Sequence, residues 1–351
     1  MNISAYIKRI ASAALAMVVS LTALTSCNGA IYDDEGDCEV VYKVRFRYDM
    51  NMKFADAFAH EVTSVNLYAF SQDGTLVWQT YENGDRLAEE GYSITLPLDP
   101  GKYKLMAWCG LDNQESFTVP GITEGGLMES LHCKLNRTYH AEDGAVSTDD
   151  LHRLFHGVID VELPESLDGG EYVYTMPLTK DTNVFRVVLQ HLSGEDIDVN
   201  DFSFKIEDSN GWLHHDNSLR DDEPITYHAW STYSGTAGVD TDGSRAITSV
   251  SVAVAELTTS RLTMRDWSLS RKPMLTIRKT DDNSVVARIP VVDYALLVKG
   301  NYNRNMSDQE YLDRQDEYNM TFFLDANNHW VDTEIIINSW KVVLNKGDLN
   351  S

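Results

Sequence analysis

Short segments in which apolar and polar residues alternate are the feature that most limits the fold of this chain. In the stretch VVYKVRFRY, residues 40–48, valine, tyrosine or phenylalanine fills every second position from Val40, and Lys43, Arg45 and Arg47 lie between them. A period of two in β-branched and aromatic residues is typical of a half-buried strand. The pattern predicts an all-β protein, because similar segments recur at 62–70, 92–98, 102–109, 171–178, 184–192, 202–206, 248–257, 273–279, 284–291 and 333–344.

These strands fall into two groups, separated by a looser stretch at about residues 110–165. A chain of 351 residues is long enough for two cores, because a domain typically has ~100 to 150 residues. We therefore expect two antiparallel β-sandwich domains, one over residues 38–165 and one over residues 166–351.

Few helices are expected. The segment DDLHRLFHG at 149–157 is predicted to be a short helical piece, and SDQEYLDRQDEY at 307–318 is the clearest helix. In the second segment Ser307 and Glu310 have the spacing of a capping box. The stretch at 231–245 is rich in Gly, Ser and Asp, so we expect a mobile loop there.

The N-terminus carries a short basic region and then a mostly apolar run at residues 10–24, too short for a comfortable membrane span. The letters LTSC, ending at Cys27, resemble a bacterial lipobox. We expect residues 1–26 to be a lipoprotein signal peptide, Cys27 to be lipidated, and residues 27–37 to be an acidic linker. A plain secreted protein with a chance cysteine is the alternative, but the signal and the lipobox agree in position.

The net charge of −25 limits the partners of the chain. It argues against nucleic acid and against electrostatic binding to anionic lipid, and it favours solubility at a cell surface. Three further cysteines, Cys38, Cys109 and Cys133, follow Cys27. At most one disulfide can form among three thiols, and we expect it to involve Cys109, although the sequence does not give the connectivity.

Signals for catalysis or metal binding are weak. His152 and His156 have helical i, i+4 spacing but lack the glutamate of a zinc protease motif. His214 and His215 are adjacent in LHHDN, which suits a polar hairpin better than a ligand pair. The letters DTDG at 240–243 lack the later ligands of a calcium loop. We expect no enzyme activity, no metal and no cofactor.

Two further groups of residues are more simply explained by structure. Asp313, Asp316 and Glu317 surround Arg314 in YLDRQDEY, which is typical of a solvated or salt-bridged helix face rather than of a carboxylate pair in a cleft. Tryptophans can form a sugar platform, yet in a sandwich most lie in the core or at its rim. The tryptophans considered are Trp78, Trp108, Trp230, Trp330 and Trp340.

Several longer stretches carry a resemblance to a known family. CEVVYKVRFRYDMNMKFADAFAHEV, LDPGKYKLMAWCGL, LTKDTN, VVLQHLSG, DYALLVKG, YLDRQDEYNMTFFLD and IIINSWKVV occur in this order. They resemble the FimB-type fimbrial anchor subunits of Bacteroidales, which belong to the type V pilus system. The resemblance implies two transthyretin-like sandwiches on a lipid-anchored subunit of the outer membrane. It also implies assembly with pilus stalk or accessory subunits by strand exchange, in which a donated strand completes a neighbour's sandwich.

Two sequence features favour an anchor that keeps its lipid and accepts a strand. The first basic residue after Cys27 is Lys43, inside the first predicted strand, where proteolytic cleavage would damage the fold. The end of the chain, NKGDLNS, has no spare alternating apolar segment to donate. The strands at 40–48 and 335–344 are candidate walls of the acceptor groove, because first and last strands often lie at sheet edges.

Other functions stay open at this point. A surface glycan-binding lipoprotein associated with an outer-membrane nutrient transporter would also have a lipobox, sandwiches and tryptophans, and an exposed row of aromatics would favour it. A tip adhesin is a variant of the pilus hypothesis, but it is expected to lose its lipid. An extracellular enzyme is the weakest alternative.

Overall fold

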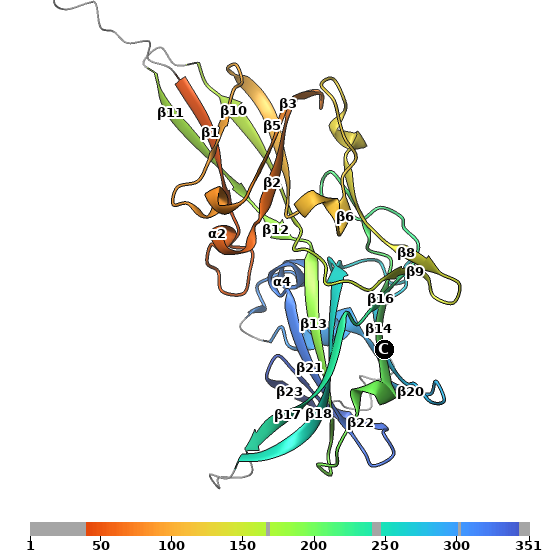
Figure 1. Ribbon diagram of the computed structural model, residues 1–351. Helices are drawn as coiled ribbons and strands as arrows, with labels where there is room; N and C mark the ends of the chain where they lie inside the picture. The colour runs from red at the N-terminus through yellow and green to blue at the C-terminus, as the bar shows by residue number, and fades with distance from the viewer. Residues whose placement is uncertain (1–39, 166–168, 241–246, 301–302, 344–351) are drawn as a thin grey trace, which may run out of the picture.

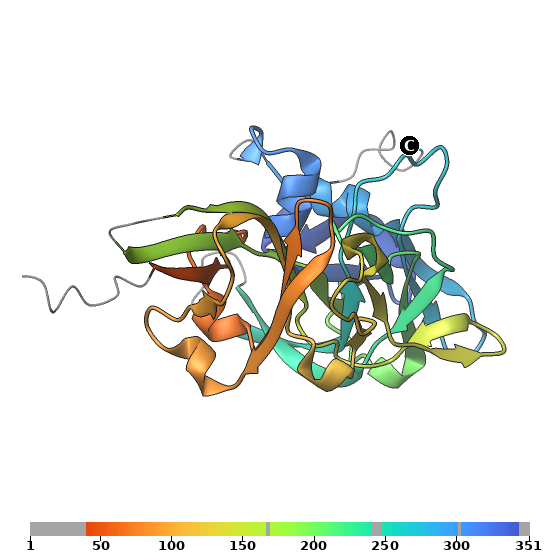
Figure 2. The same cartoon turned by 90° about the horizontal axis from the view of Figure 1, so that it is seen from above.

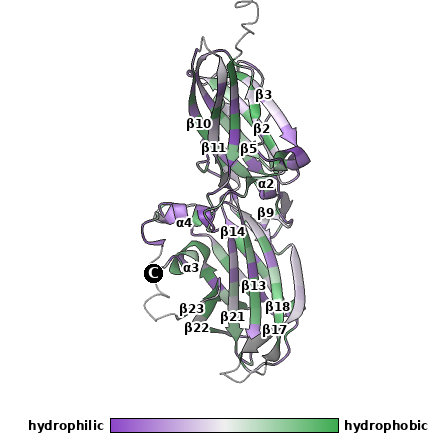
Figure 3. Ribbon diagram, turned by 90° about the vertical axis from the view of Figure 1, so that its left-hand side faces the viewer, coloured by the Kyte–Doolittle hydropathy of each residue, from purple (hydrophilic) through white to green (hydrophobic). Residues whose placement is uncertain are grey.

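The computed structural model describes residues 40–165, 169–240, 247–300 and 303–343, and it is built almost entirely of β-strands (Figure 1). Two β-sandwiches lie end to end, with helix α4 at the junction between them (Figures 1 and 3). Hydrophobic and hydrophilic residues alternate along several strands, as the sequence pattern requires (Figure 3). The expected all-β fold of two sandwiches with few short helices is confirmed.

The first sandwich packs a three-stranded sheet, in the order β11-β1-β4, against a five-stranded sheet, in the order β12-β10-β5-β2-β3. Its core contains Val44, Phe46, Leu67 and Leu105, all buried between the two sheets. The elements are β1 Val40–Arg47, α2 Phe58–Glu61, β2 Ser64–Ser71, β3 Leu76–Asn83, β4 Ile94–Leu96, β5 Gly101–Cys109, β10 Phe155–Leu163, β11 Gly170–Pro177 and β12 Thr179–Lys180.

The second sandwich packs two six-stranded sheets, in the orders β17-β18-β13-β21-β22-β23 and β20-β19-β14-β16-β9-β8. Phe185, Ile206, Ile277 and Phe322 lie in its buried core. The elements are β13 Thr182–His191, β14 Phe202–Asp208, β16 Ile225–His228, β17 Ser231–Asp240, β18 Ile247–Ser260, β19 Met274–Lys279, β20 Val285–Pro290, α3 Val291–Leu297, α4 Asp308–Arg314, β21 Glu317–Leu324, β22 Trp330–Ile337 and β23 Trp340–Val343.

The looser stretch between the two groups of strands interlocks the sandwiches. Strand β9 (Gly144–Ser147) pairs with β16 of the second sandwich, and β8 (Thr138–His140) extends that sheet. Strands β6 (Phe117–Thr118) and β7 (His132–Leu135) form a small sheet with β15 (Trp212–His214). A segment from the first half of the sequence therefore builds part of the second sandwich.

Most strand pairs of the described residues are antiparallel, but three of them are parallel: β1 with β11, β13 with β21, and β9 with β16. Figure 2 shows β1 and β11 side by side. Strand β11 thus pairs inside the first sandwich, and only Asp181 separates β12 of the first sandwich from β13 of the second. The division at residues 165/166 stays a prediction, and from this connectivity we propose a boundary near Asp181.

The helix expected at 307–318 is confirmed over residues 308–314 as α4, where the Ser307 hydroxyl accepts a hydrogen bond from the Glu310 amide at 3.0 Å, but it is wrong at its end, because Glu317 begins strand β21. The helix predicted at 149–157 is wrong: residues 151–154 are not helical, and Phe155 begins strand β10. The mobile loop predicted at 231–245 is also wrong over residues 231–240, which form strand β17 because β18 pairs with them throughout. The rest of that loop lies outside the described residues.

The expected disulfide involving Cys109 is wrong. Cys109 and Cys133 are free thiols, and each is buried in a different hydrophobic cluster. Burial raises the pKa of both thiols, because an apolar surrounding disfavours the thiolate. The strand positions explain the outcome, since β5 carries Cys109 into the first core while β7 carries Cys133 into the second. Cys38 lies outside the described residues.

Candidate docking site

The two strands expected to form groove walls occupy different positions in their sheets. Strand β1 pairs with β11 on one side and with β4 on the other, so its prediction as an edge strand is wrong. Strand β11, which comes much later in the chain, pairs with the side of β1 that would otherwise be an open edge. Strand β23 does lie at the edge of its six-stranded sheet, paired only with β22 among the described residues.

A partly apolar cleft of about 620 Å³ lies beside β23. Trp340 and Leu297 are 60% and 46% exposed, so the cleft carries two large apolar residues that face solvent. Four segments meet there: the loop before α2, the end of α3, helix α4, and β23. The apolar lining residues are Met52, Leu297, Val298, Tyr311, Trp340 and Val342.

The positions of helices α3 and α4 define one side of this cleft. Helix α3 follows Pro290 directly and buries Val291, Val292 and Ala295, which leaves Leu297 at its last turn facing out of the core. The ammonium of Lys299 then donates to the Met306 carbonyl and to the Asp308 carboxylate, both at 2.7 Å, and so joins the end of α3 to the start of α4. An edge strand beside an apolar cleft has the two parts that strand addition requires, open backbone groups and side-chain pockets.

Two of the three carboxylates considered in YLDRQDEY, Asp313 and Asp316, are ion-paired, and the set is not arranged as a pair across a cleft. Asp313 accepts two hydrogen bonds from the Arg261 guanidinium, at 2.7 and 2.8 Å. Asp316 accepts from the buried ammonium of Lys180 at 2.6 Å. Arg314 donates to the Glu310 carboxylate at 3.0 Å, within its own helix. Glu317 is exposed at the start of β21.

These contacts join the two sandwiches. Lys180 also donates to Glu61 of helix α2 at 2.7 Å. Arg314 donates to the Asp49 carbonyl at 2.9 Å and lies 4.6 Å from the ring centre of Phe54. The motif that carries much of the family resemblance therefore builds the junction between domains. Lys180 is a junction residue that sequence reasoning missed, and LTKDTN contained it.

Asp181 lies buried between the sandwiches. It accepts a hydrogen bond from the Asn217 amide at 2.8 Å, and its other carboxylate oxygen, Oδ2, has no hydrogen-bond partner in the described part of the chain. Burial raises its pKa to about 7, although the Arg261 guanidinium opposes the shift. The junction thus contains a carboxyl group that titrates near neutral pH.

The candidate histidines do not converge. His156 is buried in β10 with Nε2 at 2.9 Å from the His215 carbonyl, and burial lowers its pKa to about 4. His152 is partly exposed and lies 3.7 Å from carboxylate oxygens of Asp112 and Glu115. His214 lies in β15, and its ring centre is 6.5 Å from that of His215. The described residues contain no cluster of three or more His, Cys, Asp or Glu able to hold a metal.

Two other candidates cannot be placed. Most of the DTDG stretch and the whole N-terminal segment with Cys27 lie outside the described residues. Among the described helices, none has the length and apolarity needed to span a bilayer.

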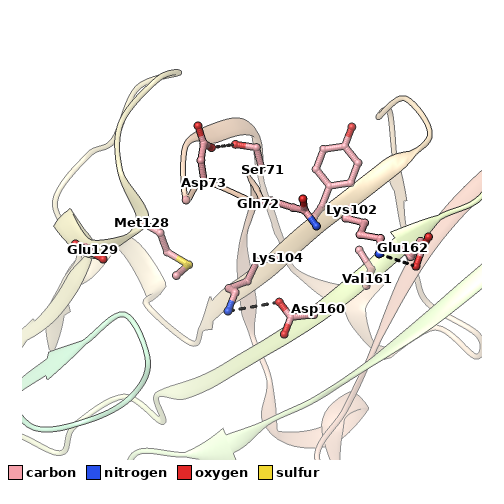
Figure 4. A pocket seen from close by; sticks show the side chains of 12 residues that line it. Ser71, Gln72, Asp73, Lys102, Lys104, Met128, Glu129, Asp160, Val161 and Glu162 are labelled. Atoms are coloured by element: carbon pink, nitrogen blue, oxygen red, sulfur yellow. Dashed lines mark hydrogen bonds and ion pairs between the residues drawn. The ribbon is translucent and has the colours of Figure 1, made fainter.

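The five candidate tryptophans are dispersed. Trp108 is fully buried, Trp78 and Trp330 are half-buried, and Trp230 and Trp340 are exposed on different elements. They do not form the row of aromatics that a sugar platform needs. Another cleft, beside the turn at 71–74, is lined mainly by charged residues (Figure 4). There Lys102 and Lys104 face Glu162 and Asp160 across neighbouring strands at 3.5 and 3.4 Å.

Comparison with known proteins identifies the family. A family model described as fimbrillin-A associated anchor proteins Mfa1 and Mfa2 matches residues 34–346. The chain belongs to this anchor family. The resemblance that the sequence motifs carried is therefore confirmed, and membership makes the chain a fimbrial anchor or associated subunit. The anchor family is a family of structural proteins of the fimbrium rather than of enzymes.

Similar proteins of known structure share the fold over most of the chain. A candidate adhesin from Bacteroides thetaiotaomicron is 35% identical, with a TM-score of 0.75, and the match covers 88% of this chain and 98% of that one. A candidate polysaccharide-binding protein from the same species is 30% identical, with a TM-score of 0.73 and coverage of 88% and 100%. The fimbrial anchor protein Mfa2 from Porphyromonas gingivalis is 18% identical, with a TM-score of 0.62 and coverage of 88% and 100%.

A curated relative gives a shorter match. The minor fimbrium anchoring subunit Mfa2 of Porphyromonas gingivalis is 32% identical over 91 residues. These residues are 26% of this chain and 28% of the relative, so the match spans little more than a quarter of that protein.

Proposed function

We propose that this chain is a lipid-anchored subunit that holds the base of a type V pilus to the outer membrane. The thiol of Cys27 would carry the lipid, and the acidic linker would separate the membrane from the first sandwich. Each acyl CH₂ placed in lipid contributes ~0.8 kcal/mol, and stable anchoring needs more than one chain, which a bacterial lipoprotein has.

Retention of the lipid is supported by the position of Lys43. It lies in β1, a strand with partners on both sides, and its ammonium donates to Glu171 of β11 at 2.6 Å. A protease that cuts after a basic residue would have to open this sheet to reach the bond.

We further propose that the chain accepts a donor strand from the adjacent stalk subunit at the β23 cleft. The observation that carries this proposal is the edge position of β23 beside the exposed side chains of Trp340 and Leu297. A donated strand would pair with the β23 backbone and place alternate side chains in the cleft. Such pairing can be very stable without covalent linkage.

The test compares two leucines in the lipidated protein, purified gently in detergent from its native cells. Leu297→Asp places a charge in the cleft, while Leu269→Asp places one on a loop where the leucine is 84% exposed. Bands from an unheated SDS gel are identified by mass spectrometry. We expect a ladder that contains a stalk subunit and collapses on boiling for the wild type and Leu269→Asp, and its loss for Leu297→Asp. An unchanged ladder in Leu297→Asp would place the contact elsewhere.

A second candidate function is glycan binding, because a relative 30% identical is described as a candidate polysaccharide-binding protein. The dispersed tryptophans do not support an aromatic platform as its basis. Purification as a monomer, or together with an outer-membrane transporter, would favour this candidate over the pilus anchor.

A further inference from the structure

The small sheet of β15, β7 and β6 carries a group of basic side chains around a tryptophan. Trp212 pairs with Lys134 across neighbouring strands, and His214 pairs with His132. Arg220 lies on the other side of Trp212, because its amide donates to the Trp212 carbonyl at 2.9 Å. All five residues are half-buried, and we call them the Trp212 cluster.

Strand alternation places the cluster on the outer face of this sheet. Leu213 and Cys133, which lie between cluster residues in sequence, are buried in one hydrophobic core. Successive side chains of a strand point to opposite faces, so the cluster faces away from that core. The face lies beside the junction of the sandwiches, where the His215 carbonyl is 2.9 Å from Nε2 of His156 in β10. It is an open surface outside the clefts described above.

Two cations converge on the indole of this cluster. The Lys134 ammonium lies 4.7 Å from the centre of the Trp212 ring, and the guanidinium carbon of Arg220 lies 4.1 Å from it. They reach the ring from opposite sides of β15, and cation–π attraction holds both against it. A guanidinium that stacks through its face keeps the N–H groups in its plane available to an anion.

Neither cation is neutralised within the described part of the chain. Lys134 and Arg220 make no ion pair and no side-chain hydrogen bond there. The three strands contain no acidic residue, although acidic residues outnumber basic ones by 54 to 29 in the chain. Two acids lie close in sequence. Asp216 accepts from the Ser218 hydroxyl at 2.6 Å, and Asp221 follows Arg220, but neither pairs with a cluster cation.

The pKa of His214 responds to this uncompensated charge. Burial lowers the pKa most, and the Arg220 guanidinium is the next largest cause of the decrease. Asp216 opposes the decrease by a smaller amount. The positive charge of Arg220 therefore acts across the face of the sheet.

Stabilisation of the sheet explains only part of this arrangement. Stacking on Trp212 gives both cations a structural role. It does not explain why the facing residues are all basic or aromatic, because opposite charges on facing residues stabilise a sheet and like charges destabilise it. An acidic residue in place of His132 or His214 would lie next to the cations and compensate them.

We propose that the Trp212 cluster docks an acidic polypeptide segment of a partner protein. Lys134 and Arg220 both contact one ring, so their charged groups are at most about 9 Å apart. Same-face side chains of an extended segment repeat every ~7 Å, so carboxylates on alternate residues reach both cations. Salt screens charges beyond ~8 Å at physiological ionic strength, so these cations outweigh the distant net charge of −25.

The surface favours a polypeptide over other anions. Small anions are bound mainly in concave sites, whereas partner proteins bind to open surfaces such as this sheet face. A sugar ring would stack on an open aromatic face, and the two cations occupy both faces of the Trp212 indole. This surface is separate from the β23 cleft and does not depend on strand exchange.

Fluorescence anisotropy with the full detergent-solubilised protein at neutral pH tests the proposal. The probes are a labelled hexapeptide of glutamate, the matching hexapeptide of glutamine, and a hexamer of galacturonate, which carries the same number of carboxylates on a sugar chain. We expect the glutamate peptide to bind at least about tenfold more tightly than either of the others. Its binding is expected to weaken as salt is added.

Variants locate the binding. Lys134→Ala combined with Arg220→Ala is expected to weaken binding of the glutamate peptide about tenfold or more, because both charge-assisted contacts are lost. Lys102→Ala combined with Lys104→Ala is the matched control. It removes the same net charge from another sheet, where the two lysines already pair with Glu162 and Asp160, and we expect less than a twofold change.

Three results would overturn the proposal. Equal or tighter binding of the galacturonate hexamer would indicate a site for acidic glycans. Equal binding of the glutamate and glutamine peptides, or no binding of either, would show that no acidic segment docks there. Equal losses in the two double variants would place the contact elsewhere. The preference of the wild type among the probes decides the matter if a variant does not fold.

Discussion

The ammonium group of Lys180 lies 2.6 Å from a carboxylate oxygen of Asp316 and so joins the end of the first sandwich to the second. The same nitrogen lies 2.7 Å from Glu61 on helix α2. The Lys180 side chain is 5% exposed, whereas those of Glu61 and Asp316 are 34% and 20% exposed. A buried cation held by two carboxylates fixes how the two sandwiches meet.

Lys180→Met is expected to lower the free energy of unfolding by about 2 to 3 kcal/mol. Removing one partner of a fully buried ion pair costs ~3 to 5 kcal/mol, and the partial exposure of both carboxylates reduces this cost. Urea unfolding at neutral pH measures the change. Lys102→Met is the control, because Lys102 is 56% exposed and 3.5 Å from its partner Glu162, and we expect a loss below ~1 kcal/mol. Equal losses in the two variants would contradict a special role for Lys180.

Asp181→Asn is expected to raise stability at neutral pH. Burial raises the pKa of Asp181 from 3.8 to about 7. Because the pKa is raised in the folded state, the free energy of unfolding is highest below pH 3.8, where Asp181 is protonated in both states. It falls as the pH rises toward 7, because the unfolded chain releases this proton first. The advantage of the asparagine variant therefore grows over this window, on the order of 1.4 kcal/mol per pH unit at most, and stays constant above it.

Unfolding free energies from pH 4 to 8 measure this effect. Asp73→Asn is the control, because hydrogen bonds from Ser71 and Thr75 lower the pKa of Asp73, so the effect of this variant on stability is expected to stay nearly constant across this pH range. The stability that Asp73 contributes is present above its unfolded pKa and is lost only as the pH falls. A pH-independent effect of Asp181→Asn would show that its carboxyl does not titrate in this window.

The sequence predicted which segments form strands better than it predicted which strands pair with one another. Alternation at 40–48 identified a strand and its buried face, but a period of two does not say which strand lies beside it. The parallel pairing of β1 with β11 joins residues about 130 positions apart, and no local signal encodes it. The two histidines in DDLHRLFHG had helical spacing, yet their segment leads into β10 because β5 pairs with it residue by residue.

The candidate site was less predictable still. The sequence indicated that the last strand could lie at an edge, and it does. The cleft beside it is formed by Met52, Leu297 and Trp340, which approach one another only in the folded chain. Helix α3 was missed because its residues VVDYALL continue the apolar run of β20 without a polar break.

Gly110→Ala is expected to be strongly destabilising, whereas Gly74→Ala is expected to cost only about 1 kcal/mol. Both glycines have positive φ, at 78° and 82°. A Cβ on Gly110 would lie 1.9 Å from the Arg153 carbonyl oxygen, while a Cβ on Gly74 meets nothing within 4 Å. Thermal unfolding of the two variants separates the steric effect from the conformational one. Equal shifts would contradict the close approach of residue 153 to residue 110.

In the function proposed above, a lipid on Cys27 holds the pilus to the cell. The most direct measurement compares fimbriae in the cell and medium fractions of strains that carry wild-type protein or Cys27→Ala, by immunoblotting and electron microscopy. We predict that the variant and its attached fimbriae move into the medium. Fimbriae that remain on the cells at normal length would contradict the anchor function.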